Sequence, residues 1–198
     1  MVDDESKGEL PGLSTTAMAA LLSRMDGIVD PHGSNRAFME FQFAKKLAEF
    51  RKIVGDGGVA QQRAAYVSDH ASAFDVCSQA RLCHDDVYEN NVLVHAGRGE
   101  LKLSGLLDVE NAVAGDPLLD LAKTWMYSIK TDMSKWAALV DGYGPLGDRA
   151  AERLNLYRTY HAVELCCWLA TTRRTAPAAD LVEAVRAFTT GANPLPVR

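Results

Sequence analysis

The sequence lacks the features that mark membrane and secreted proteins. Its 198 residues contain no run of about 18 apolar residues, the length that a membrane-spanning helix needs. The opening stretch, MVDDESKGELPG, is acidic and has no apolar centre, so it does not read as a signal peptide. These absences predict a cytoplasmic protein with no membrane partner.

Cysteine and positive charge are also scarce. The four cysteines, Cys77, Cys83, Cys166 and Cys167, form no C-x-x-C pair, so we expect buried reduced thiols rather than a disulfide framework. Lys and Arg number 21 against 26 Asp and Glu, and this net charge of −5 argues against a general nucleic-acid binder. What remains, with 47% apolar residues, is typical of one globular domain with a substantial core.

Polar residues gather between apolar runs in the middle of the chain. His84, Asp85 and Asp86 are followed by Asn91, and then by the apolar residues 92–94. Residues 96–99 contain two glycines and predict a turn. A second apolar run leads to Leu106 and Leu107. The pattern indicates a loop, a short strand, a turn and another short strand.

Such a hairpin would place oxygen-bearing side chains at one spot. Asn91 stands before its first strand and Asp108 after its second, so the two would lie close together, with Asp86 nearby in the loop. One amide oxygen and two carboxylates are hard ligands that suit Mg²⁺. Mg²⁺ bound in this way usually takes its other ligands from water and phosphates, so this arrangement predicts a phosphoryl-transfer site.

The chain resembles the aminoglycoside phosphotransferase family, the small-molecule kinases with a protein-kinase-like fold. The resemblance rests on the spacing H-x-D-x-x-x-x-N in residues 84–91, on LLDVE in residues 106–110, and on GDPLLDLA in residues 115–122. Asp85 departs from the family, which often has Gly there, and Val109 stands where Trp is common. The resemblance covers roughly residues 10–190.

The resemblance implies an ATP- and Mg²⁺-dependent phosphotransferase that moves the γ-phosphate of ATP to a hydroxyl. Asp86 would be the catalytic base. His84 would be the second catalytic-site residue, with the role of ordering the loop through hydrogen bonds to its backbone. Asn91 and Asp108 would hold magnesium. Asp116, followed by Pro117, starts a helix, and with Asp120 it has an architectural role.

The acceptor is a small molecule that the sequence does not single out. An aminoglycoside antibiotic, which would make the chain a resistance enzyme, is one candidate; sugars, choline-like alcohols and amino alcohols are others. Four residues are candidates for acceptor binding: Asp85, Glu110, His161 and Glu164.

The expected fold class is mainly α (α+β): the helical C-terminal lobe of a protein-kinase-like fold with a short β-hairpin that carries the catalytic and metal loops. Helices are expected near residues 14–25, 34–54, 59–70, 117–129, 134–143, 148–173 and 178–188. Along the helix at 148–173 we expect Leu154, Tyr157, Leu165, Trp168 and Leu169 to be buried. Residues 1–13 are expected to form a hinge-like linker, 14–190 the lobe, and 191–198 a tail.

The N-terminal β lobe of such kinases is expected to be absent. No series of alternating strands occurs in residues 1–80, Gly55–Gly58 reads as a helix end, and Lys45 and Lys46 fall inside a helical pattern. A truncation, a relic gene, or a separate chain that supplies the β lobe would each explain this. The activity of the chain alone is therefore an open question at the level of sequence.

Two other functions are compatible with parts of the pattern. A pseudokinase-like binding module would keep the helical lobe but not use ATP. An HD-type metal-dependent phosphohydrolase would use His84 and Asp85, with His70 upstream, but it requires that dipeptide on a helix. The apolar run at 92–94 and the glycines of the turn favour strands nearby instead.

Overall fold

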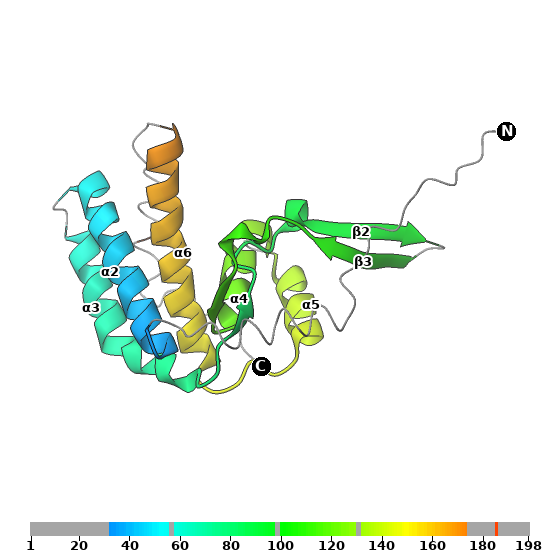
Figure 1. Cartoon of the computed structure of the whole chain (residues 1–198), viewed down its shortest axis with the longest axis horizontal. Helices are drawn as coiled ribbons and strands as arrows, with labels where there is room; N and C mark the ends of the chain where they lie inside the picture. The colour runs from blue at the N-terminus through cyan, green and yellow to red at the C-terminus, as the bar shows by residue number, and fades with distance from the viewer. Residues whose placement is uncertain (1–31, 56–57, 98–99, 130–131, 174–184, 186–198) are drawn as a thin grey trace.

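The computed structural model describes residues 32–55, 58–97, 100–129, 132–173 and 185. Three helices pack side by side at one end of the molecule: α2 (Asn35–Val54), α3 (Val59–His70) and the long α6 (Ala150–Arg173) (Figure 1). On the other side of α6 lies α4 (Leu118–Thr124), which continues as a π-helical turn, η4 (Trp125–Ile129). The shorter α5 (Met133–Tyr143) packs on η4.

Helix α2 begins and ends where the sequence predicts. The Ser34 hydroxyl oxygen accepts a hydrogen bond of 3.1 Å from the Ala37 N–H, which satisfies one of the free donors of the first turn. Gly55 ends the helix at a φ of +67°, a conformation that costs glycine little. Of the apolar side chains that repeat at three- and four-residue steps along it, Met39, Phe43, Leu47 and Phe50 are buried and Val54 is partly buried.

The stretch between α3 and the catalytic loop is a 3-10 helix, η1 (Ala71–Val76), followed by the strand β1 (Arg81–Cys83). The sequence motifs gave no indication of the partner of this strand. Strand β1 pairs antiparallel with β4 (Val113–Gly115), with Leu82 opposite Ala114. This pairing fixes both ends of the segment that holds the polar residues of the predicted site.

The expected hairpin is present as β2 (Val92–Gly97) and β3 (Glu100–Leu106), paired antiparallel with an irregularity between Leu93 and Val94. It projects away from the helices (Figure 1). Two 3-10 turns flank it: η2 (Glu89–Asn91) leads into β2, and η3 (Val109–Asn111) connects β3 to β4.

One expectation about α6 is wrong. Leu154 and Tyr157 are fully buried, whereas Trp168 is 55% exposed. Leu165 and Leu169 are only partly buried, and Leu165 and Trp168 line a cavity, although Cys166 and Cys167 on the same turn are buried in the core. An apolar stripe predicts a helix face but not which of its side chains reach the core and which line a cavity.

The architecture confirms a mainly α fold with a small antiparallel β part. In residues 32–55 and 58–80 the chain forms helices and no strand, and Lys45 and Lys46 lie within α2 as expected. The expected helices near 14–25 and 178–188, apart from residue 185, and the limits of the linker and tail, lie outside the described residues. No helix among the described residues is long and apolar enough to cross a membrane.

Candidate active site

The loop from His84 to Asn91 is held by the carboxylate of Asp120 on α4. The backbone N–H of His84 donates to one oxygen of Asp120 at 3.0 Å, and the N–H of Asp85 donates to the other at 2.6 Å. Two charge-assisted bonds to one carboxylate fix consecutive peptide groups. Asp120 therefore ties the start of the loop to the helical layer.

Asp85 has an unusual backbone and an unusual environment. Its φ is +56°, in the left-handed region that glycine enters most easily and that Asp tolerates better than most residues. This conformation accounts for glycine being common here in the family that the sequence resembles. The side chain is buried, and burial raises the pKa of its carboxyl to about 6, against the opposing effects of His161 and Lys123. Its Oδ1 accepts no hydrogen bond from any described residue.

The carboxylate of Asp86 is held from two sides. The side-chain N–H of Asn91 donates to its Oδ2 at 2.9 Å and also to the Asp86 backbone oxygen at 2.9 Å. On the other side the ammonium group of Lys123 lies 3.5 Å from Oδ1. Lys123 also donates a hydrogen bond to the backbone oxygen of Asp85. Asp86 is thus oriented by one amide and one cation.

Lys123 is the part of the site that sequence reasoning missed. Asp120, Lys123 and Thr124 stand three and four residues apart on α4, so they share one face of an otherwise apolar helix. All three contact the loop, since the Thr124 hydroxyl donates to the Val87 backbone oxygen at 2.8 Å. Polar residues at this spacing on an apolar helix were the available signal.

The end of the hairpin is joined to the loop through Leu107. Its N–H donates to the Asn91 backbone oxygen at 2.9 Å, and its carbonyl oxygen lies 2.8 Å from Nε2 of His84. His84 therefore contacts backbone, as expected of a residue that orders the loop. Asp108 follows directly, with a φ of +58° and an exposed side chain that has no partner among the described residues.

The oxygen atoms offered here fit a hard cation. Asn91 uses its amide nitrogen on Asp86, which leaves its amide oxygen as the candidate ligand atom. Asp108, whose carboxylate is exposed, directly follows Leu107, the residue whose N–H donates to the Asn91 backbone oxygen. Both are ligand types that Mg²⁺ prefers, and phosphate oxygens usually complete such sites. The part of the chain that the structure describes contains no group of three or more His, Cys, Asp or Glu side chains placed to hold a metal without such help.

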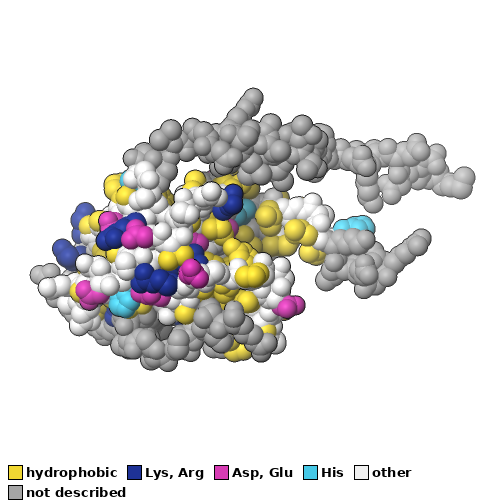
Figure 2. Space-filling view, turned by 90° about the horizontal axis from the view of Figure 1, so that it is seen from below, with side chains coloured by type: hydrophobic (Ala, Val, Ile, Leu, Met, Phe, Trp, Pro, Cys, Tyr) yellow, Lys and Arg dark blue, Asp and Glu magenta, His cyan; other side chains and the backbone are white. Residues whose placement is uncertain are grey.

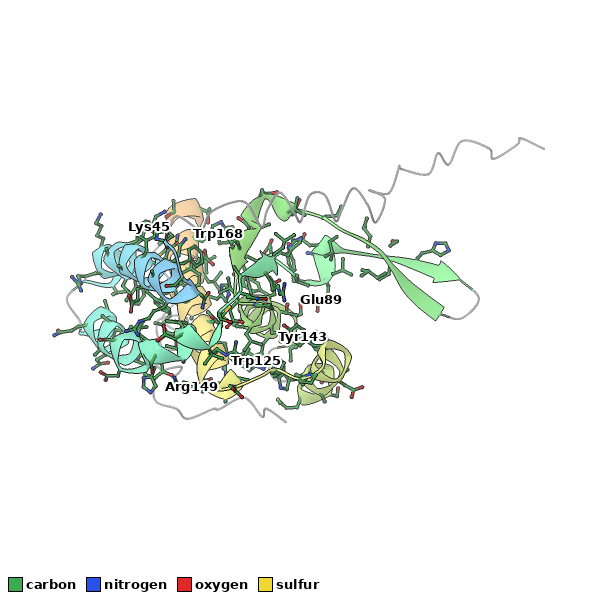
Figure 3. All side chains as sticks on the ribbon, turned by 60° about the horizontal axis from the view of Figure 1, so that its bottom comes forward. Lys45, Glu89, Trp125, Tyr143, Arg149 and Trp168 are labelled. Atoms are coloured by element: carbon green, nitrogen blue, oxygen red, sulfur yellow. The ribbon has the colours of Figure 1, made fainter. Side chains whose placement is uncertain are left out.

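A cavity of about 550 Å³ opens beside Asp86. Lys123 and Asp86 form one wall, and Glu164 and Trp168 of α6 form another, with Trp168 projecting near α2 (Figure 3). His161 lies behind Glu164, fully buried, with Nδ1 at 3.4 Å from the Glu164 carboxylate. Burial raises the pKa of Glu164, but the hydrogen bond and charge of His161, with nearby lysines, outweigh burial and hold that pKa below its ordinary value.

The predicted acceptor residues therefore separate into two groups. Asp85 and Glu164 lie on either side of His161, whose Nε2 is 3.7 Å from the Asp85 carboxylate and 3.1 Å from the Leu119 backbone oxygen. Glu110 is exposed beyond Asp108 and does not line the cavity, although its neighbour Asn111 does.

Asp116 lies away from the cavity in a buried network. Its carboxylate accepts hydrogen bonds from the Arg153 guanidinium at 2.7 Å, the Tyr157 hydroxyl at 2.8 Å and the Leu118 N–H at 3.1 Å. The hydrogen bond from the Leu118 N–H lies at the first turn of α4, where the sequence predicted that Asp116 starts a helix. Asp116 thus connects α4 to α6 and has an architectural place.

The arrangement does not match the HD phosphohydrolase alternative. His84 and Asp85 follow strand β1 in a loop and are not on a helix. His70 ends α3, where its Nδ1 lies 2.8 Å from the Tyr66 backbone oxygen. The dipeptide therefore lacks the helical setting that this alternative requires.

Comparison with protein families agrees with this geometry. A model described as the phosphotransferase enzyme family matches residues 9–156. The chain belongs to this family. The match includes the catalytic loop, the hairpin and α4, and it makes the chain a phosphotransferase-family, kinase-like protein, as the sequence motifs indicated. Comparisons with curated proteins and with solved structures gave no match.

Proposed function

We propose that this phosphotransferase-family chain moves the γ-phosphoryl group of ATP to a hydroxyl of a small molecule. The observation that carries the proposal is the carboxylate of Asp86, which lines a cavity large enough for a small acceptor while Asn91 and Lys123 fix its orientation. A base held in this way is ready to receive the hydroxyl proton.

In the proposed reaction the acceptor oxygen attacks the γ-phosphorus as the bond to the β–γ bridging oxygen breaks. The acceptor becomes a phosphoester, ADP leaves, and the hydroxyl proton passes to Asp86. Catalysis of this kind depends on positioning and charge more than on covalent chemistry. The bonds from Asp120 and Asn91 to the loop supply that positioning.

Magnesium belongs to the proposal through Asn91 and Asp108. Their oxygens would hold the ion, and the ion when bound would neutralise charge on the phosphates. The residues of the hairpin base contribute by holding these two side chains on adjacent segments, through the bonds of Leu107 to Asn91 and His84.

A kinase needs a lysine and a glycine-rich loop that hold the phosphates of ATP, here called the nucleotide clamp. The described residues that precede His84 do not supply it. Residues 32–55 and 58–80 form helices and loops and supply no strand with a phosphate-binding lysine. We propose that the clamp lies elsewhere in the polypeptide or on a separate chain that carries a β lobe. Phosphotransfer should then rise by several orders of magnitude when such a lobe is added in trans to a chain that lacks it.

The test is phosphotransfer from ATP to a panel of small hydroxyl compounds, with Asp86→Asn as the variant. We expect the rate to fall at least about 100-fold, as for loss of a positioned general base, with little change in the melting temperature. Asp69→Asn, at an exposed position on α3, is the matched control and should keep full activity.

Two results would count against the proposal. Retained activity in Asp86→Asn would remove the base from the mechanism. No transfer from the wild-type chain even with such a β lobe added, together with no shift in melting temperature when ATP and Mg²⁺ are added, would favour a pseudokinase-like binding module.

A further inference from the structure

The charges that line the acceptor cavity are balanced within the cavity itself. Among the described residues, its carboxylates are Glu49, Asp86 and Glu164, and its ammonium groups are Lys46 and Lys123. Each carboxylate has an ammonium group within 4 Å: Glu49 lies 3.3 Å from Lys46, Asp86 lies 3.5 Å from Lys123, and Glu164 lies 3.9 Å from Lys123. The net formal charge of these five groups is −1.

This balance disfavours an acceptor that carries several amines. A polycation binds tightly where carboxylates lack cations of their own, because each amine then gains a charge partner without displacing another. Here every amine would compete with an internal lysine, and it would meet Lys123 next to the base. Repulsion by a buried like charge is an effective means of rejecting a ligand.

Lys123 is also able to bind a further group. Among the described residues its ammonium group donates one hydrogen bond, to the Asp85 backbone oxygen, and its distances to the carboxylates of Asp86 and Glu164 exceed the ordinary N–H···O range. An ammonium group has three donors, so two of them are directed at partners that are only loosely engaged. The side chain is 10% exposed and lines the cavity, so a ligand atom reaches it from one side only.

The spacing of Lys123 and Glu164 matches a ligand with adjacent opposite charges. Their charged atoms are 3.9 Å apart, near enough for one small ligand that carries an ammonium and a carboxylate group on the same carbon to contact both. The indole of Trp168 stands one helical turn after Glu164 and lines the same cavity, so an ammonium group at Glu164 would also lie near an aromatic ring. Asp86 lies 3.5 Å from Lys123, so a hydroxyl on the same small ligand would be close to the base.

Resting on the function proposed above, we propose that the acceptor is a zwitterion, a hydroxyl compound with adjacent ammonium and carboxylate groups, and that Lys123 determines this specificity. Lys123 binds the carboxylate of the acceptor and Glu164 binds its ammonium group. Polycationic compounds are rejected by the same lysine.

The test measures binding and does not require phosphotransfer. L-Serine and ethanolamine differ only by a carboxylate, and kanamycin serves as the polycation. Calorimetric titration of the full chain with the three probes should show L-serine binding at least about 10-fold more tightly than ethanolamine, and kanamycin binding more weakly than L-serine.

Replacement of Lys123 should reverse this order. Lys123→Met keeps the length of the side chain and removes its charge. We therefore expect it to weaken the binding of L-serine at least about 10-fold and to strengthen the binding of kanamycin. Lys45→Met, at an exposed lysine of α2 outside the cavity lining, should change neither. Glu164→Gln is a second variant. It should weaken the binding of both L-serine and ethanolamine, because both carry the ammonium group that Glu164 is proposed to bind.

Several outcomes would overturn the inference. They are kanamycin or ethanolamine binding the wild-type chain more tightly than L-serine, no binding of L-serine at millimolar concentration, or an unchanged order of affinities in Lys123→Met. The wild-type comparison needs no variant, so a poorly folded Lys123→Met would leave it intact. Because ATP is absent from the titrations, failure here is distinct from failure of the phosphotransfer assay.

Discussion

The catalytic loop and the hairpin that follows it are consecutive in sequence but are built in opposite ways. In the loop, His84, Asp85 and Asn91 are buried, and α4 contacts it through the side chains of Asp120, Lys123 and Thr124. In the hairpin, four apolar side chains are exposed to solvent: Leu93, Val94, Leu103 and Leu106 are 45% to 68% exposed. Apolar side chains gather on the surface toward the hairpin end of the molecule (Figure 2).

This contrast divides the candidate site into two halves. The helical layer fixes the base and the acceptor cavity, since the bonds from α4 hold the loop from its first peptide group to Val87. The hairpin contributes Asp108 and is joined to the loop at its base through Leu107. Changes in the loop should therefore alter stability strongly, and changes along the hairpin should alter it little.

Loss of the Asp120 carboxylate should have the largest effect. Asp120→Ala removes the acceptor for two backbone N–H groups, and hydrogen bonds to a charged group contribute about 1.5–3 kcal/mol each. We expect the free energy of unfolding to fall by about 4 kcal/mol, measured by urea denaturation. Asp120→Asn keeps one acceptor oxygen and should lose about half as much. A loss below about 0.5 kcal/mol in Asp120→Ala would show that the loop is not held from α4.

The charge on Asp85 should reduce stability at neutral pH. Because burial raises the pKa of its carboxyl to about 6 in the folded chain, against an ordinary value near 4, the folded state binds the proton more tightly than the unfolded state does. This contribution to stability is full below about pH 4 and is lost as the pH rises through 6.

Asp85→Asn should therefore stabilise the chain at pH 8 by about 2–3 kcal/mol and leave it nearly unchanged at pH 4. Asn also tolerates the left-handed backbone at this position, where φ is +56°. The measurement is urea denaturation of wild type and variant at both pH values, with Asp69→Asn as the exposed control. A gain that does not depend on pH would contradict the assignment of this effect to the carboxyl group.

Thr124→Val should show a smaller effect of the same origin. The substitution keeps the shape of the side chain and removes a hydroxyl that donates to the Val87 backbone oxygen at 2.8 Å. A single neutral hydrogen bond contributes about 1 kcal/mol, so we expect a loss of that size in denaturant unfolding. Thr172→Val is the control, because Thr172 is an exposed residue of α6 whose hydroxyl donates to the Trp168 backbone oxygen and not to the loop. An equal loss in both variants would mean that contact with the loop adds nothing.

The same contrast explains how much of the molecule could be predicted from sequence. The ends of α2, the hairpin and the helix start at Asp116 depend on local signals, namely a capping serine, a glycine turn and an Asp-Pro pair, and the structure confirms them. The pairing of β1 with β4 was not predictable in this way, since it joins segments about 30 residues apart through backbone groups that carry no sequence signature.

The part of the site that the sequence predicted consists of residues that are close together in the chain. Asp86 and Asn91 lie in one loop, and the structure joins them directly. Lys123 comes from a helix 37 residues beyond Asp86, so it reaches the base only because α4 packs beneath the loop. The exposed position of Trp168 likewise depends on which side chains of α6 line the cavity, which no periodicity encodes.

The smallest effect is expected on the hairpin, and it tests the contrast from the other side. Leu103 is 68% exposed and pairs across the hairpin with Val94, itself 55% exposed. Leu103→Thr keeps a residue that favours strands and removes little buried apolar surface, so the free energy of unfolding should change by less than about 0.5 kcal/mol. Leu154→Thr, at a fully buried position of α6, is the matched substitution and should cost several kcal/mol. A loss at Leu103 that approached the loss at Leu154 would mean that the apolar face of the hairpin is covered in solution, and the hairpin would then belong to a packed interface rather than project from the helical layer.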